Sequence, residues 1–176
     1  MPPREILIAN RHPRLSLDRR AVARVIHTLD AKFFASASGQ SKIEPARRSL
    51  GAGGNRKSKI PEGEISLVFL TDPALAQLHA DFLADPTPTD VITFAGAPAA
   101  GTAGEICISA DAALRQAGRR RDFSAELILY LVHGWLHLAG YDDLQPAKKR
   151  HMRRAESRAL RLLRTAGAIP KFTLRR

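Results

Sequence analysis

Cysteine is nearly absent from this chain: Cys107 is the only one in 176 residues, so no disulfide can form within it. Aromatic residues make up only 6% of the sequence, and the longest apolar run, residues 127–140, contains two histidines and is too short to span a bilayer. The first residues also lack the apolar core of a signal peptide. These shortages disfavour a disulfide-stapled secreted protein and a membrane-spanning one. We therefore expect a soluble cytoplasmic protein, whose 44% hydrophobic and 26% charged residues suffice for a globular core.

Acidic residues are scarce in two segments where basic residues accumulate. Residues 144–176 contain eleven lysines and arginines and one acid, Glu156, and residues 32–60 contain seven and one acid, Glu44. Such segregation creates a positive surface that attracts polyanions, because binding releases their counterions. The alternative is a solvated helix face beside a floppy basic loop. Because both segments flank the motif described below, we favour contact with nucleic acid.

Hydrophobic periodicity predicts strands gathered early in the chain and helices late in it. Four segments rich in β-branched or other apolar residues are predicted strands: residues 5–9, 64–70, 90–94 and 105–109. The predicted helices are one capped by Ser16 or Asp18 and ending near Phe34, residues 72–82, residues 111–120, one capped by Ser124 that passes His137 and stops at Gly140, and a last one opened by Pro146. This order predicts an α+β fold, in which helices pack on a small mixed β-sheet.

Residues 35–63 differ in composition from the rest of the chain: they are rich in Ser, Gly, Lys and Arg and contain hardly any large apolar residues. Neither side of this segment forms an obvious complete domain. We therefore interpret it as a mobile basic insertion rather than a linker, and predict a single domain over residues 1–176.

The segment from His133 to Asp143, which reads His-Gly-Trp-Leu-His-Leu-Ala-Gly-Tyr-Asp-Asp, carries the strongest functional signal. Residues four apart lie on the same face of a helix, so His133 and His137 can present two imidazoles to one ion. Gly140 lets the backbone leave the helix in a left-handed turn, which returns Asp143 toward those rings as an oxygen ligand. We predict about one metal ion per chain, held by these two histidines and Asp143. Zinc is the default, although the mixed nitrogen and oxygen donors also suit nickel, cobalt or manganese.

The same spacing occurs in zinc proteases that read His-Glu-x-x-His-x-x-Gly-x-x-His. In those enzymes the glutamate after the first histidine is the general base, whereas this chain has Gly134 at that position. A peptidase would need its base from elsewhere, so we keep it only as a second interpretation.

The segment from His133 to Asp142 resembles the hallmark of the bacterial YbeY family, metal-dependent endoribonucleases implicated in rRNA maturation and ribosome quality control. Two upstream segments agree in order and spacing: Pro88-Thr-Asp-Val-Ile-Thr-Phe94 is similar to that family's Pro-Thr-Asp-Val-Leu-Ser-Phe strand, and Gly104-Glu-Ile-Cys-Ile-Ser109 is similar to its Gly-Asp-Ile-x-Ile segment. The resemblance covers roughly residues 64–156 and implies a zinc-hydrolase-like His-x-x-x-His helix.

The chain departs from the family pattern at two positions. The family's usual third ligand is histidine, and this chain has Asp143 there, a carboxylate that zinc accepts. The family also places an arginine just ahead of its Pro-Thr-Asp segment, where this chain has Leu83. Leucine cannot bind phosphate or stabilise the charge that develops on it.

The resemblance implies cleavage of single-stranded RNA, with rRNA or the ribosome as partner and zinc as cofactor. The ion would polarise a phosphoryl oxygen and lower the pKa of its water. Asp142 is a candidate for orienting a ligand histidine, with turn formation after Gly140 as the alternative. The candidate substrate-binding residues are Thr89, Asp90, Arg153, Arg154 and Arg158. For Thr89 and Asp90 the alternative is a strand-end role.

Other residues near the motif admit two interpretations. His151 is either a fourth ligand or a residue of the basic helix surface, and Trp135 and Tyr141 either stack on bases or, for Trp135, belong to the core. A non-enzymatic alternative for the whole chain is an rRNA-binding assembly factor with a structural metal, which Leu83 favours.

Overall fold

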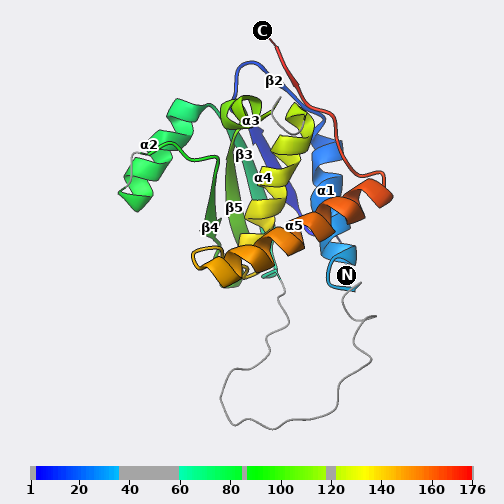
Figure 1. Ribbon diagram of the computed structural model, residues 1–176. Coiled ribbons are helices and arrows are strands. Elements are labelled where there is room, and N and C mark those ends of the chain that lie inside the picture. Colours follow the sequence, from blue (N-terminus) through cyan, green and yellow to red (C-terminus); the bar gives the residue numbers. More distant parts are fainter. Residues whose placement is uncertain (1–2, 36–59, 85–86, 118–121, 176) are drawn as a thin grey trace, which may run out of the picture.

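A mixed sheet forms the centre of the protein, whose computed structural model describes residues 3–35, 60–84, 87–117 and 122–175. Its strands are β1 (Ile6–Asn10), β3 (Glu64–Leu70), β5 (Thr102–Ser109) and β4 (Val91–Ala95), in the order β1-β3-β5-β4. β1, β3 and β5 run parallel, and β4 is antiparallel to β5 at one edge (Figure 1). The expected α+β fold with a small mixed sheet is thereby confirmed.

The two faces of the sheet carry different helices. Along β3 and β5 alternate side chains point to opposite faces, so Ile65, Leu67 and Ile106 join the main core while Cys107 joins a smaller cluster on the other face. α1 (Arg19–Lys32) and α4 (Phe123–Leu138) cover the main face, and α5 (Pro146–Thr165) crosses over both of them (Figure 1). α2 (Asp72–Leu83) packs its Leu75 on the other face. None of the described helices is long and apolar enough to cross a membrane.

Side-chain caps explain where the helices begin. Asp18 accepts hydrogen bonds from the amides of Arg20 and Ala21 and caps α1, as one of the two sequence alternatives predicted. The N-cap of α4 is Asp122, and Ser124, predicted for that role, instead exchanges hydrogen bonds with the backbone of Phe172. The sequence could not reveal this contact, because Phe172 lies 48 residues further along the chain.

Several smaller elements differ from the sequence-based expectation. α3 (Ala110–Gln116) is shorter than predicted, since Ala117 has an extended backbone with ψ of 152°. The two-residue strands β2 (Leu15–Ser16) and β6 (Thr173–Leu174) pair with each other, and Pro98–Ala100 forms a 3-10 turn. All three were too short to show a period in the sequence. Residues 36–59 of the predicted mobile insertion lie outside the described residues, and the single-domain organisation stays a prediction.

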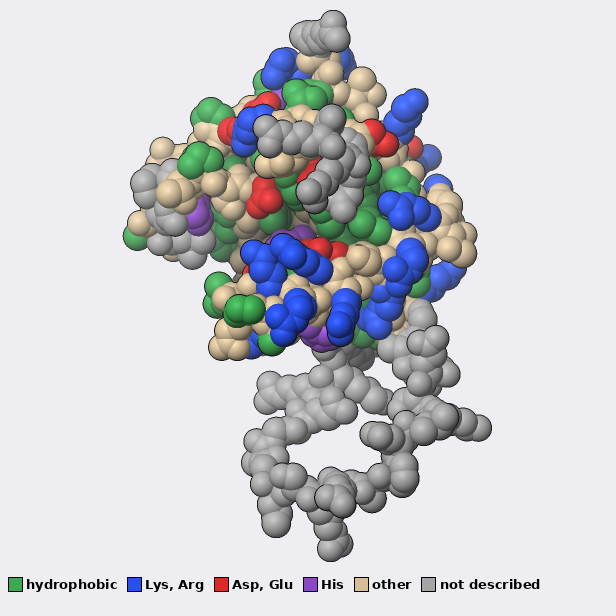
Figure 2. Space-filling view, in the orientation of Figure 1, with side chains coloured by type: hydrophobic (Ala, Val, Ile, Leu, Met, Phe, Trp, Pro, Cys, Tyr) green, Lys and Arg blue, Asp and Glu red, His purple; other side chains and the backbone are tan. Residues whose placement is uncertain are grey.

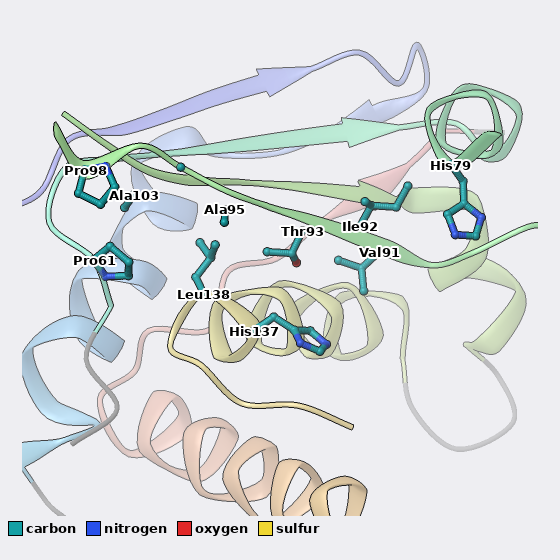
Figure 3. A pocket seen from close by; sticks show the side chains of 11 residues that line it. Pro61, His79, Val91, Ile92, Thr93, Ala95, Pro98, Ala103, His137 and Leu138 are labelled. Carbon is teal, nitrogen blue, oxygen red and sulfur yellow. The ribbon is translucent and has the colours of Figure 1, made fainter. Parts of the chain in front are cut away.

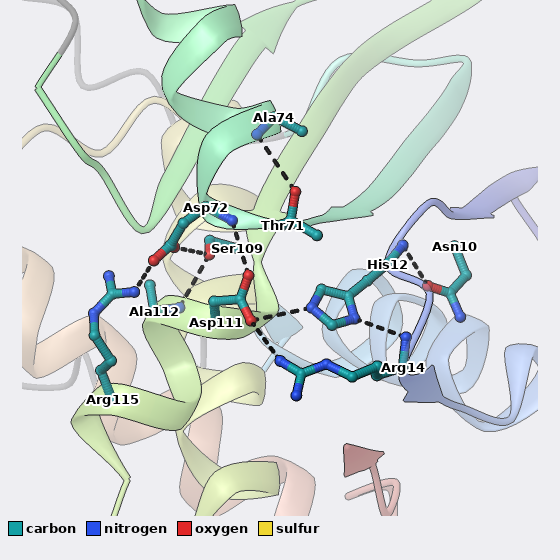
Figure 4. A network of polar contacts seen from close by, with 10 residues as sticks. All are labelled: Asn10, His12, Arg14, Thr71, Asp72, Ala74, Ser109, Asp111, Ala112 and Arg115. Atoms are coloured by element: carbon teal, nitrogen blue, oxygen red, sulfur yellow. Dashed lines mark hydrogen bonds and ion pairs between the residues drawn. The ribbon is translucent and has the colours of Figure 1, made fainter. Parts of the chain in front are cut away.

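A polar network ties together the carboxyl ends of the parallel strands (Figure 4). Ser109 at the end of β5 donates to Asp72 at the start of α2, and Arg115 pairs with the same carboxylate. Asp111 accepts from the Asp72 amide at 3.0 Å and from His12 Nε2 at 3.1 Å. His12 is 3% exposed and uses both ring nitrogens within this network, because its Nδ1 accepts from a backbone amide. The network therefore holds the ends of β1, β3 and β5 together.

Candidate metal centre

Two histidines and one carboxylate converge at the C-terminal end of α4. His133 and His137 lie one turn apart, and their Nε2 atoms are 3.0 Å from each other. Gly140, with φ of +86°, ends the helix in the left-handed region and turns the chain back. The carboxylate of Asp143 then lies 3.9 Å from His133 Nε2 and 3.8 Å from His137 Nε2. These are the three residues that the sequence grouped, and their donor atoms all lie within 4.8 Å of one another.

The outer nitrogens of both rings are held by fixed acceptors. His133 Nδ1 donates to Glu156 Oε1 of α5 at 2.7 Å, and His137 Nδ1 donates to the carbonyl oxygen of Tyr141 at 3.1 Å. A carbonyl oxygen can only accept, so His137 carries its hydrogen on Nδ1 and its Nε2 presents a lone pair. Metal-binding histidines in proteins are commonly held in this way, by a carboxylate or a carbonyl on the other ring nitrogen.

This donor set fits a divalent cation. The two Nε2 atoms lie 3.0 Å apart, a distance that suits either a proton shared between them or a metal ion bound by both lone pairs. Two imidazoles, a carboxylate and an open position are the composition of a catalytic zinc site. The residues present therefore could hold a metal, and Asp143 supplies the negative charge that the two neutral rings lack.

The electrostatics of the two histidines differ. Burial alone would lower the pKa of His133, but its hydrogen bond to Glu156 and the charges of Glu156, Asp143 and Asp90 together raise it above its ordinary value. The pKa of His137 is lowered, first by burial and then by the neighbouring His133. One ring is thus held in a negative environment, which favours a proton or a metal ion alike.

The sequence proposed Asp142 as the group that orients a histidine, and Glu156 holds that position in the structure. The Asp142 carboxylate accepts from the Leu144 amide at 2.8 Å and from Lys148 Nζ at 2.6 Å, which is turn chemistry. Both contacts lower the pKa of Asp142. Sequence reasoning missed Glu156, although it is the only acid among residues 144–176, and that isolation was the available signal.

Gly134 allows α4 to approach the sheet closely. A Cβ at this position would lie 2.4 Å from Ile106 Cγ2 and 3.2 Å from Thr93 Oγ1. The glutamate that serves as base in the zinc proteases therefore has no room here. Trp135, on the next position, is fully buried and donates to Asp30 Oδ1 at 3.1 Å, so it belongs to the core and not to a base-stacking surface.

A groove runs along the outer edge of β4 and reaches the metal centre (Figure 3). Its volume is about 450 Å³, and its floor includes Val91, Thr93 and Ala95 of β4 and His137 and Leu138 of α4. Thr89 and Asp90, the two candidates just before β4, do not line it. The Asp90 carbonyl accepts from the Ser109 amide at 2.9 Å, which extends the β4–β5 pairing, and the Thr89 hydroxyl donates to the Val91 carbonyl at 3.5 Å.

Basic side chains gather over α5, beside the metal centre (Figure 2). Arg153 and Arg154 are exposed there. Arg158 is half-buried, and its guanidinium lies 3.9 Å above the Phe33 ring, a cation–π contact. His151 is exposed and stacks on Tyr141 with ring centroids 5.0 Å apart, so it is not part of the metal group. Leu83 is the last residue of α2, and its side chain lies outside the described part of the chain.

The matching family model and the similar curated proteins carry the same family description. The family model described as "Endoribonuclease YbeY" matches residues 37–164. Similar curated proteins of that name come from Chlamydia pneumoniae, 42% identical over 120 residues (63% of this chain and 76% of the relative), and from Anaeromyxobacter, 37% identical over 111 residues (61% and 58%). The solution structure of a Thermotoga maritima protein matches with a TM-score of 0.51 over 93% of this chain and 94% of that one. At 17% identity, this last likeness shows the fold alone.

Proposed function

The chain belongs to the YbeY family, and we propose on that basis that it is a metal-dependent endoribonuclease that cleaves single-stranded RNA in rRNA maturation and ribosome quality control. The observation that supports this most is the convergence of His133, His137 and Asp143, with the outer nitrogens of both rings held by fixed acceptors. The family model described as "Endoribonuclease YbeY" spans residues 37–164 and so includes all three residues.

We propose zinc as the ion held by these three residues, with other divalent metals as alternatives. A divalent ion supplies Lewis acidity toward a phosphoryl oxygen and makes water more acidic. Glu156 keeps the His133 ring oriented, and the Tyr141 carbonyl does the same for His137. Asp143 provides the carboxylate of the site from the segment that follows α4, so no other helix has to supply one.

RNA phosphates are the natural partners of the cations on α5. Arg153 and Arg154 are exposed and belong to the same helix as Glu156, so a strand bound along them passes the metal centre. Arg158 is held over Phe33, which fixes its guanidinium and reduces the entropy lost on binding. Thr89 and Asp90 precede the groove and are proposed as contacts for the RNA at its entrance.

One alternative is that the protein binds RNA but does not cleave it. Leu83 stands where the family resemblance leads us to expect an arginine, and this favours an rRNA-binding assembly factor with a structural metal. A zinc peptidase is the weaker alternative, because a side chain at position 134 would collide with Ile106.

Cleavage of a single-stranded rRNA fragment by the metal-reconstituted protein tests the proposal. We expect cleavage that is lost on chelation, restored by metal, and absent from the His133→Ala variant, while casein stays intact under the same conditions. RNA binding without cleavage in the reconstituted parent would contradict the nuclease and favour the assembly factor. Casein cleavage that depends on His133 would favour the peptidase.

The role of α5 is tested by the salt dependence of RNA binding. We expect Arg153→Gln with Arg154→Gln to reduce the slope of log K against log salt by about 0.7 for each phosphate that these side chains neutralise in the parent. The matched control is Arg19→Gln with Arg20→Gln, which removes the same charge from exposed positions on α1. Equal slopes in both double variants would mean that the α5 arginines only solvate their helix.

A further inference from the structure

We infer that the groove along the outer edge of β4 receives an unstacked base of the RNA strand, while the phosphates of that strand lie toward α5. This inference rests on the proposed endoribonuclease function and goes beyond it, because it assigns a base-binding subsite. The subsite consists of backbone groups of β4 between mostly apolar side chains, adjoining His137.

The pairing of β4 shows which of its backbone groups point into the groove. The Ser109 amide donates to Asp90 and the Gly96 amide donates to Ala103, at 2.9 and 3.1 Å. In an antiparallel ladder the residues that face the partner strand alternate with residues that face away. In the register of β4 on β5, the N–H and C=O groups of Val91, Thr93 and Ala95 therefore face away from β5. No other described strand pairs with this edge.

The lining of the groove suits a base and not a phosphate. Among the described residues its lining has no lysine or arginine, and most of these side chains are apolar, among them Val91, Ala95, Pro98 and Leu138. A base presents apolar faces to such walls and alternating donors and acceptors to an amide edge, and single-stranded RNA is read mainly through unstacked bases. The volume of about 450 Å³ lies within the range of small-ligand pockets, about 300–1,000 Å³.

The position of the groove relative to the cations gives the strand its orientation. Figure 3 shows α4 lying between β4 and α5, with the His137 ring projecting from α4 beside the groove. On the far side, Glu156 joins His133 to the helix that carries the exposed arginines. The metal centre thus lies between a basic helix and a groove whose described lining has no lysine, arginine, aspartate or glutamate. A nucleotide has the same division, with an uncharged base at one end and a charged phosphate at the other.

An abasic scan tests this assignment. A single-stranded RNA that the protein cleaves is synthesised as a series, each member lacking one base, and kcat/KM is measured for each with metal content matched. We expect one or two positions beside the scissile bond at which removal of the base lowers kcat/KM at least tenfold. In the Ala95→Phe variant, which fills the groove, the same positions should show less than a twofold effect, because the base can no longer enter.

The control variant is Ala100→Phe, which adds the same ring at an exposed alanine outside the groove and should keep the parent's abasic profile. Metal content and melting temperature confirm that each variant is folded. A parent that cleaves RNA with a flat abasic profile would overturn the base subsite and leave the nuclease standing. An unchanged profile in Ala95→Phe would overturn it too. Inhibition of the parent by short extended peptides, relieved in Ala95→Phe, would assign the groove to a peptide strand instead.

Discussion

Replacing Glu156 by glutamine removes one negative charge from beside His133 and keeps an oxygen that can accept a hydrogen bond. In the parent the carboxylate accepts from His133 Nδ1 at 2.7 Å, and both side chains are mostly buried, with 16% and 22% of their surfaces exposed. Hydrogen bonds to a charged partner are about twice as strong as neutral ones. Loss of a group that orients a metal-binding histidine typically weakens metal affinity about 10–100-fold, or about 1.4–2.7 kcal/mol. We expect Glu156→Ala to lie in this range and Glu156→Gln to lose less.

The pH dependence separates an electrostatic role of Glu156 from a merely structural one. Glu156 raises the pKa of His133, so in the parent a proton competes with the metal for this ring at higher pH than it does in the Glu156→Gln variant. Well above the raised pKa neither protein carries that proton, and the full difference in metal affinity is measured. As pH falls through the raised pKa, His133 of the parent becomes protonated and must release this proton when it binds the metal, whereas His133 of the variant is still neutral. The difference in metal affinity between the two proteins should therefore narrow.

Competition with a chromophoric chelator between pH 5.5 and 8.5 measures both effects. Asp81→Asn on α2 is the charge-matched control, because it removes one carboxylate from the opposite face of the sheet. Equal metal affinities for the parent and Glu156→Ala at pH 8 would refute the orienting role, and equal affinities for the parent and Glu156→Gln would refute the contribution of the charge. A difference that stays constant with pH would show that the variant acts through packing and not through the charge on Glu156.

Four further changes test separate parts of the reasoning. Asp143→His should keep metal binding in a metal analysis, because imidazole is an equally good zinc ligand. Leu83→Arg should raise the cleavage rate tenfold or more with a smaller change in RNA affinity, and a variant no faster than the parent would mean that no cation is needed there. Thr93→Val should stabilise the protein against urea by about 1 kcal/mol, since the buried Thr93 hydroxyl has no partner among the described residues. Burial, then the charge and hydrogen bond of Glu105, raise the pKa of Cys107 to about 12, which favours the neutral thiol in the fold. The contribution of Cys107 to the free energy of unfolding should be fully present below the unfolded thiol's pKa of 9.0 and should fall from there toward pH 12, by up to about 1.4 kcal/mol per pH unit. The Cys107→Ala variant should not show this part of the loss.

The sequence predicts the three members of the metal group because their geometry is local. The i, i+4 spacing of the two histidines, the left-handed turn at Gly140 and the position of Asp143 all follow from the backbone of α4 and the turn after it. The strands were predictable for a similar reason. Their alternating faces bury Ile65 and Ile106 on one side and Cys107 on the other, and this pattern is written into the residue order.

The partners of that group were not predictable, because they depend on how helices pack. Glu156 meets His133 only through the crossing of α5 over α4, which no spacing encodes. Asp142 was the attractive candidate because it stands beside Asp143 in the sequence, yet its side chain is used within its own turn. Proximity along the chain identified the three residues that could hold a metal, and only the tertiary structure shows what orients two of them.

Gly134 connects the fold to the proposed chemistry. The absence of a Cβ there lets α4 lie close against Ile106 of β5 and Thr93 of β4, and this contact places the His137 ring beside the outer edge of β4. A glutamate at the same position would serve as a base in a peptidase, but it would hold the helix away from the sheet and separate the metal group from the groove. Glycine at this position therefore does more than leave out a base. It lets the metal group lie beside a groove whose described lining has no lysine or arginine, and in the inferred binding mode a nucleotide places its base in that groove and its phosphate toward the arginines of α5.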